Sequence, residues 1–189
     1  VDGGLPGVGR NNGATKAKNG IIVFFDADVR LSSSTFLDDS FKEFKKRKLD
    51  IATCDIWPSD GTAVNTMMFQ TYNLYARLLE KIKPHAAGMC IFITKKIHDR
   101  ISGFDEKVMI AEDMDYVQRA AQFGKFGILR SWPIITTTRR FMKDGNLKTI
   151  IKYLLTELHM ATLGSVKTDI FNYKFGYTEA KEKSFKIRK

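Results

Sequence analysis

The sequence has few cysteines, few histidines and no long apolar run. Its two cysteines, Cys54 and Cys90, do not have the spacing of a metal site, and we expect both to be buried free thiols in a reducing, cytoplasmic compartment. The three histidines are scattered and form no Ser/His/Asp or Cys/His set. No stretch reaches the roughly 18 uninterrupted apolar residues that a membrane-spanning helix needs. The first residues also lack the basic and apolar regions of a signal peptide.

Positive charge is what the sequence has in excess. The 31 lysines and arginines outnumber the 21 acidic residues and give a formal net charge of +10 over 189 residues. This excess favours an anionic partner, which could be nucleic acid, anionic lipid or a diphosphate substrate. The apolar share of 43% is ordinary for one globular domain with a sizeable core.

Short apolar runs alternate with segments of helical periodicity. The runs of strand length are residues 21–25, 49–54, 89–93, 126–129 and 134–138. Helical spacing is found at residues 11–18, 37–44, 64–82, 96–101, 113–123 and 147–163. This alternation predicts an α/β fold, with a mostly parallel sheet and helices on both of its faces. Because the run at 21–25 is apolar at every position, we expect it to be a central strand.

Two aspartates, Asp26 and Asp28, directly follow this first strand. The strand should deliver them to the carboxyl edge of the sheet, where open α/β folds bind ligands. Mg²⁺ and Mn²⁺ take carboxylate oxygens together with substrate phosphates. An isolated pair of this kind is also common as a solvated turn, but the buried strand before it favours a Mg²⁺ or Mn²⁺ site.

A second acidic pair, Glu112 and Asp113, opens the helix expected at 113–123. Carboxylates at a helix start are stabilised by the helix dipole and by free backbone amides, so this pair has a structural explanation as well as a catalytic one. Asp115 and Arg119 stand four residues apart, which predicts an ion pair along the helix.

The order of these segments resembles glycosyltransferase family 2, whose catalytic domains have the GT-A fold. The resemblance is carried by G-R-N-N-G-A at 9–14, I-I-V-F-F-D-A-D at 21–28, G-F-D-E at 103–106, E-D-M-D at 112–115 with Arg119, and G-K-F at 124–126. Each segment alone is common, whereas their order and spacing together are specific. The resemblance implies a GT-A-like catalytic domain over residues 1–145. Residues 146–189 then form a C-terminal helix and a basic, aromatic tail.

The resemblance implies an inverting transferase that moves a sugar from a UDP- or GDP-linked donor to a hydroxyl group of a glycan or lipid-linked acceptor. Asp28 would hold the Mg²⁺ or Mn²⁺ ion that bridges the donor diphosphate, and Asp26 would assist it or contact the ribose. Arg10 would lie near the nucleotide or diphosphate. Asp113 would be the general base, with Glu112 beside it.

Two features depart from the family pattern. Processive members carry Q-x-x-R-W where this chain has T-T-T-R-R-F at 136–141, so polymer synthesis is not implied, although Arg139 or Arg140 could neutralise the diphosphate. Family members also begin with a β-α-β unit that holds the nucleoside. Only eight residues precede Gly9, and we therefore expect the chain to be N-terminally incomplete.

Three alternatives stay open at this point. One is a metal-dependent nucleotidyltransferase of similar fold, and another is a non-catalytic basic module that binds anionic membrane or nucleic acid. A nucleic-acid partner is disfavoured because such a module needs no strand-end acids. The third is whether the C-terminal part contacts a membrane. Residues 147–163 have more apolar positions than one helix face requires, and the tail from Ser165 has seven Lys/Arg against three Asp/Glu. They predict peripheral contact with the inner face of a membrane, unless the helix is simply a core helix.

Overall fold

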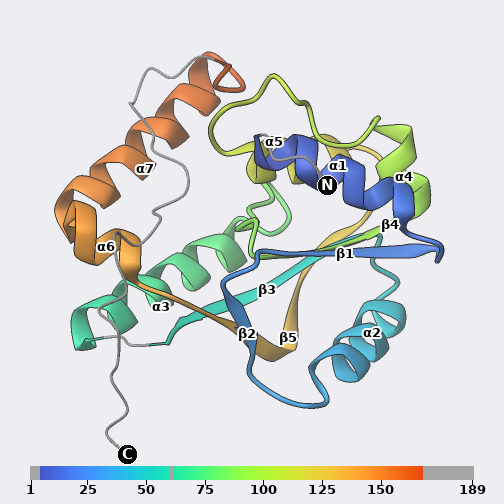
Figure 1. The fold of residues 1–189 in the computed structure, drawn as a ribbon, viewed down its shortest axis with the longest axis horizontal. Helices are drawn as coiled ribbons and strands as arrows, with labels where there is room; N and C mark the ends of the chain where they lie inside the picture. The colour runs from blue at the N-terminus through green and yellow to red at the C-terminus, as the bar shows by residue number, and fades with distance from the viewer. Residues whose placement is uncertain (1–4, 60–61, 168–189) are drawn as a thin grey trace, which may run out of the picture.

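The computed structural model describes residues 5–59 and 62–167, which form five strands and seven helices. In chain order they are α1 (Pro6–Lys16), β1 (Ile21–Phe25), β2 (Val29–Leu31), α2 (Phe36–Lys46), β3 (Ile51–Pro58), α3 (Ala63–Leu78), β4 (Cys90–Thr94), α4 (Lys95–Arg100), α5 (Glu112–Ala121), β5 (Phe126–Thr136), α6 (Arg139–Asp144) and α7 (Asn146–Thr162). The strands make one sheet in the order β1-β4-β3-β5-β2 (Figure 1).

The α/β class is confirmed, but the expectation of a mostly parallel sheet is wrong for the described strands. Only β3 and β5 run parallel, whereas β1 with β4, β4 with β3, and β2 with β5 are antiparallel. The strand β1 is also at the end of the order rather than in the centre. Its continuous apolar run reflects side chains packed against both faces of the sheet, which happens whatever the direction of the neighbouring strand.

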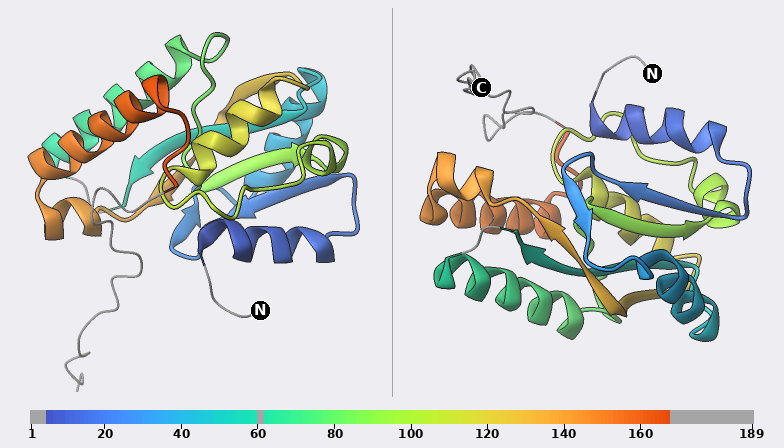
Figure 2. Two further views of the ribbon diagram at one scale, coloured as in Figure 1. Left: turned by 90° about the horizontal axis from the view of Figure 1, so that it is seen from above. Right: turned by 60° about the horizontal axis from the view of Figure 1, so that its bottom comes forward.

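The core has two halves, one on each face of the sheet. On β4, Ile91 and Ile93 pack on the face covered by α1, α4 and α5, whereas Cys90 and Phe92 pack on the face covered by α2. The views in Figure 2 show α1 and α2 on opposite sides of the sheet. Both cysteines are buried and free, as the sequence predicts.

The strand β5 joins two short strands that the sequence separates. Leu129 is opposite Cys54 and Ile134 is opposite Ile56, so residues 130–133 face Asp55 alone and form an irregularity in the ladder. The short strand β2, which the sequence analysis missed, pairs with the far end of β5.

The helix α7 follows α6 and packs against it. It also contacts the loop before β4, because Glu157 accepts hydrogen bonds from Lys83 and pairs with His85 Nε2 at 2.7 Å. None of the helices in the described ranges is long and apolar enough to cross a membrane. The domain boundary at residue 145 stays a prediction, and the tail beyond residue 167 lies outside the described residues.

Candidate functional site

The two strand-end aspartates lie in the turn that connects β1 to β2. The amide N–H of Asp26 donates to the carbonyl of Met89 at 3.4 Å, which fixes the turn beside the start of β4. The side chains of Asp26 and Asp28 are 37% and 49% exposed. Both carboxylates are therefore open to ligands from solution.

The pairing of β2 with β5 brings an arginine to Asp28. Val29 lies opposite Thr136, so the residues just before β2 and just after β5 are neighbours although they are far apart in the sequence. Arg139, the first residue of α6, donates from Nη2 to Asp28 Oδ2 at 2.9 Å, and both side chains are partly exposed. The side chain of Arg140 lies outside the described part of the structure, so its role stays a prediction.

Arg10 connects the two acidic segments of the sequence. Its guanidinium donates to Asp26 Oδ1 at 2.8 Å and to Glu112 Oε1 at 2.6 Å, and it lies over the ring of Phe104 at 5.3 Å. Burial disfavours its charged form, but Glu112, Asp113 and Asp26 outweigh burial and raise the pKa of Arg10. The family resemblance predicts Arg10 near the nucleotide or diphosphate, and the structure places it between the two acidic pairs.

Asp113 has an enclosed carboxyl group at the start of α5. Its Oδ2 accepts from the amide of Gly88 at 2.5 Å, and its Oδ1 accepts from the amide of Met114 at 2.8 Å. Burial and the negative charge of Glu112 raise the pKa of Asp113 to about 7, against the opposing effects of Arg10 and the two amides. The residue as a whole is half-buried, and backbone amides hold both oxygens of its carboxyl group. A carboxylate with a pKa near neutrality can accept a proton from a substrate hydroxyl.

The start of α5 has an unusual backbone. Ala111 has φ 58° and ψ 39°, a left-handed conformation that a residue with a Cβ rarely adopts. Directly after it, Glu112 and Asp113 occupy the first turn, where the helix dipole favours negative charge. Strained backbone of this kind persists where the surroundings enforce it, and such positions cluster at functional sites.

Two residues of this cluster escaped the sequence analysis as functional positions. A Cβ on Gly88 would come within 2.5 Å of Arg10 Nη2 and 3.1 Å of Asp113 Oδ2, so any larger residue here would have to displace these two side chains. The side chain of Asn11 donates to the carbonyl of Phe104 at 3.0 Å and accepts from its amide at 2.8 Å. Asn11 follows Arg10 in the G-R-N-N segment, which was the available signal, whereas Gly88 had none.

The ion pair expected along α5 is present, and it has a structural role. Arg119 Nε donates to Asp115 Oδ2 at 2.8 Å, and its Nη1 donates to the carbonyls of Ile101 and Gly103 at 3.0 Å. Asp115 also accepts from Ser165. This pair therefore anchors the G-F-D-E loop to α5 and stands apart from the acids around Arg10.

An open groove of about 570 Å³ adjoins the strand-end acids. It runs between α1 and the free edge of β1, and Arg10, Asp26 and Ala27 line one end of it. Glu112 and Asp113 are not part of its lining. The groove thus gives space beside the acids of β1 and leaves the acids of α5 on the other side of Arg10.

The acids suit a divalent cation that arrives with a substrate. The described residues contain no group of three or more His, Cys, Asp or Glu side chains that could cage a metal. Asp26 and Asp28 supply two carboxylates, and each already holds an arginine, which is the charge that a cation would replace. Mg²⁺ and Mn²⁺ are commonly bound by one or two carboxylates plus substrate phosphates, so these residues fit such an ion.

No family profile and no curated protein sequence matches this chain. Solved structures do match. TarS 1–349 of S. aureus aligns with TM-score 0.53 and 14% identity over 84% of this chain and 52% of that one. The same protein in complex with UDP-GlcNAc aligns with TM-score 0.54 and 20% identity over 74% and 40% of the two chains. The mannosyltransferase PcManGT from Pyrobaculum calidifontis, in complex with GDP-Man and Mn²⁺, aligns with TM-score 0.55 and 17% identity over 77% and 42%.

At these identities the likeness establishes the fold. The chain has a GT-A-like α/β fold, and it spans about half the length, or less, of the structures that it matches.

Proposed function

We propose that this chain is the catalytic part of an inverting glycosyltransferase that moves a hexosyl group from a UDP- or GDP-linked donor to an acceptor hydroxyl. One observation carries the proposal: Arg10 ties the strand-end Asp26 to the helix-start Glu112, beside an Asp113 whose pKa is about 7. A sugar transfer needs stabilisation of the negative charge on the departing diphosphate and a base at the attacking hydroxyl. This cluster offers carboxylates that can hold a cation on the first side and an acid that can act as the base on the second.

In the proposed reaction, Asp113 accepts the proton of the acceptor hydroxyl while that oxygen bonds to the anomeric carbon. The bond from this carbon to the diphosphate oxygen breaks in the same displacement, so the configuration inverts. The amides of Gly88 and Met114 hold the two oxygens of Asp113 and fix the direction of the carboxyl. Arg10 pairs with Glu112 and compensates the negative charge beside the base.

On the donor side, Asp28 with Asp26 would hold the Mg²⁺ or Mn²⁺ ion. Such an ion supplies charge stabilisation for the departing diphosphate. Arg139 is exposed and bound to Asp28, and it can turn from this carboxylate to the diphosphate oxygens, for which a guanidinium has suitable geometry. The matched structures in complex with UDP-GlcNAc, and with GDP-Man and Mn²⁺, support UDP and GDP as the first nucleotides to test.

Calorimetry with UDP and with GDP, each with and without Mn²⁺, tests this proposal on the full chain. We expect Mn²⁺-dependent binding of one nucleotide, about tenfold or more weaker in Asp28→Asn, because a neutral amide is a poor ligand for a hard cation. Asp26→Asn should weaken binding less. Asp38→Asn, an exposed aspartate on α2, is the matched control. Unchanged and metal-independent affinity in Asp28→Asn would refute the metal assignment.

A further inference from the structure

The helix α7 presents its apolar side to solvent. Leu147, Ile151, Leu154 and Leu158 recur at helical spacing and are between 46% and 72% exposed. The buried positions of the helix include Thr149 and Thr156, whose hydroxyls donate to carbonyls of the preceding turn. An amphipathic core helix would have the opposite arrangement, so the outward face of α7 is built for an apolar environment.

The helix α3 repeats this arrangement. Val64, Met67, Leu74 and Leu78 form an outward stripe and are between 51% and 70% exposed. Two asparagines face inward, and the amide of Asn73 exchanges hydrogen bonds of 3.1 and 2.9 Å with the backbone of Ile56. Phe69 and Ala76 supply the apolar part of the inner face, and they leave the outer stripe uncovered.

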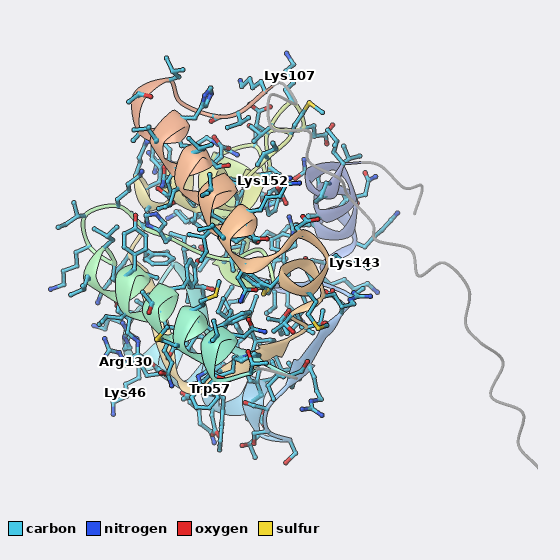
Figure 3. All side chains as sticks on the ribbon, turned by 90° about the vertical axis from the view of Figure 1, so that its left-hand side faces the viewer. Lys46, Trp57, Lys107, Arg130, Lys143 and Lys152 are labelled. Carbon is cyan, nitrogen blue, oxygen red and sulfur yellow. The ribbon has the colours of Figure 1, made fainter. Side chains whose placement is uncertain are left out.

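The two helices that carry these stripes lie on the same side of the molecule. Both helices are on the left in Figure 1, and both face the viewer in Figure 3, where Lys143 and Lys152 are labelled beside them. We call this surface, formed by the outward residues of α3 and α7, the α3–α7 face. The two stripes come from distant parts of the sequence. Exposed apolar residues therefore occur on two helices of this face and are not a peculiarity of one helix.

The two helices that form the α3–α7 face carry more basic than acidic residues. The helix α3 has no acidic residue, and the one acid of α7, Glu157, is bound by Lys83 and His85. Lys148 and Lys152 lie on α7 itself. Trp57, at the end of β3, is 47% exposed, and Tyr75, on α3, is 41% exposed. Tryptophan and tyrosine are amphipathic side chains that are enriched where membranes meet water.

From these observations we propose that the α3–α7 face docks on the surface of an anionic lipid bilayer, with α3 and α7 lying along the headgroup region. Apolar side chains enter the boundary of the acyl chains, and the lysines contact anionic headgroups. The sequence predicts membrane contact through residues 147–163 and the tail. The structure adds α3, and it gives the contact a defined face that does not depend on the residues beyond 167.

Co-sedimentation of the full chain with vesicles tests the proposal. We expect binding to phosphatidylcholine vesicles that contain phosphatidylserine, weaker binding to pure phosphatidylcholine, and loss of binding at high salt. The double variant Leu154→Gln/Leu158→Gln on α7, and Leu74→Gln/Leu78→Gln on α3, should each weaken binding by about tenfold. Lys148→Gln/Lys152→Gln should weaken binding to the anionic vesicles alone. Leu37→Gln, an exposed leucine of α2, is the control that should bind as the parent chain does.

Three results would overturn the proposal. They are no binding of the parent chain at low salt, equal binding to neutral and anionic vesicles, and full binding by the α3 and α7 variants, which would assign the contact to the tail. Sedimentation velocity without vesicles tests whether a second copy of the chain binds this face instead. If the parent chain self-associates, the leucine variants are monomeric and vesicles are not bound, then the face meets a second copy of the chain. Circular dichroism confirms that each variant is folded, and nucleotide binding is measured separately because it does not depend on this face.

Discussion

The two acidic pairs have the same kinds of side chain and opposite environments. Asp28, at the end of a strand, is 49% exposed and holds a partly exposed arginine. Asp113, at the start of a helix, has an enclosed carboxyl that is held by two amides, and its pKa is raised to about 7. An open carboxylate suits a cation that arrives with its own phosphates, whereas an enclosed one suits proton transfer. The two carboxylates therefore suit different roles, cation binding and proton transfer, because their surroundings differ.

The two arginines differ in the same way. Arg10 is 12% exposed and is shared by both acidic pairs, so its loss would leave buried negative charge without compensation. Arg139 is 40% exposed and pairs with the half-exposed Asp28. We infer that Arg10 is a fixed part of the structure and that Arg139 can exchange partners.

The largest expected effect is on the enclosed acid. Asp113→Asn should bind the UDP- or GDP-linked donor as the parent chain does, but lose turnover by about 100-fold or more, because an amide cannot accept the acceptor proton. The measurement compares donor affinity by calorimetry with turnover on a hydroxyl acceptor. Near-parental turnover in Asp113→Asn, with Asp38→Asn unaffected, would move the base to another residue.

The pH dependence of turnover sharpens the same contrast. The base works in its ionised form, so turnover should fall about tenfold for each pH unit below about 7 and level off above it. Burial is the main cause of the raised pKa of Asp113. A flat profile between pH 5 and 8 on the folded chain would contradict the raised pKa of Asp113.

The sequence predicts the elements well and their arrangement less well. The apolar run at Ile21–Phe25 and the acidic start of α5 are local patterns, and the structure has both in the predicted places. Strand direction and order depend on contacts between distant segments, so the pairing of β1 with β4 and the position of β1 at the edge were not predictable from apolar runs. The same limit applies to the site. Its acids were recognisable, but their link through Arg10 joins residues 102 positions apart.

Gly88 offers a test of how tightly the enclosed side is packed. Gly88→Ala should lower the free energy of unfolding by about 1–3 kcal/mol and reduce turnover, because the new methyl group meets Arg10 and Asp113. Gly9→Ala is the matched control, since nothing lies within 4 Å of its Cβ position in α1, and it should be stabilising by about 0.5–1 kcal/mol. Chemical denaturation of both variants measures the difference. Equal stability of the two would show that the cluster around Arg10 relaxes freely.

The smallest expected effect concerns the open side. In the absence of nucleotide, Arg139 competes with a cation for Asp28, and an exposed pair of this kind contributes about 0.2–1 kcal/mol. Arg139→Gln should therefore bind Mn²⁺ alone about two- to fivefold more tightly, as measured by the loss of the free Mn²⁺ signal in electron paramagnetic resonance. With UDP or GDP present the sign should reverse, because the variant lacks the guanidinium that contacts the diphosphate. Arg130→Gln is the control, since its guanidinium is exposed and faces Glu80. A change of the same sign with and without nucleotide would mean that Arg139 does not exchange partners, and the contrast between the two arginines would then rest on burial alone.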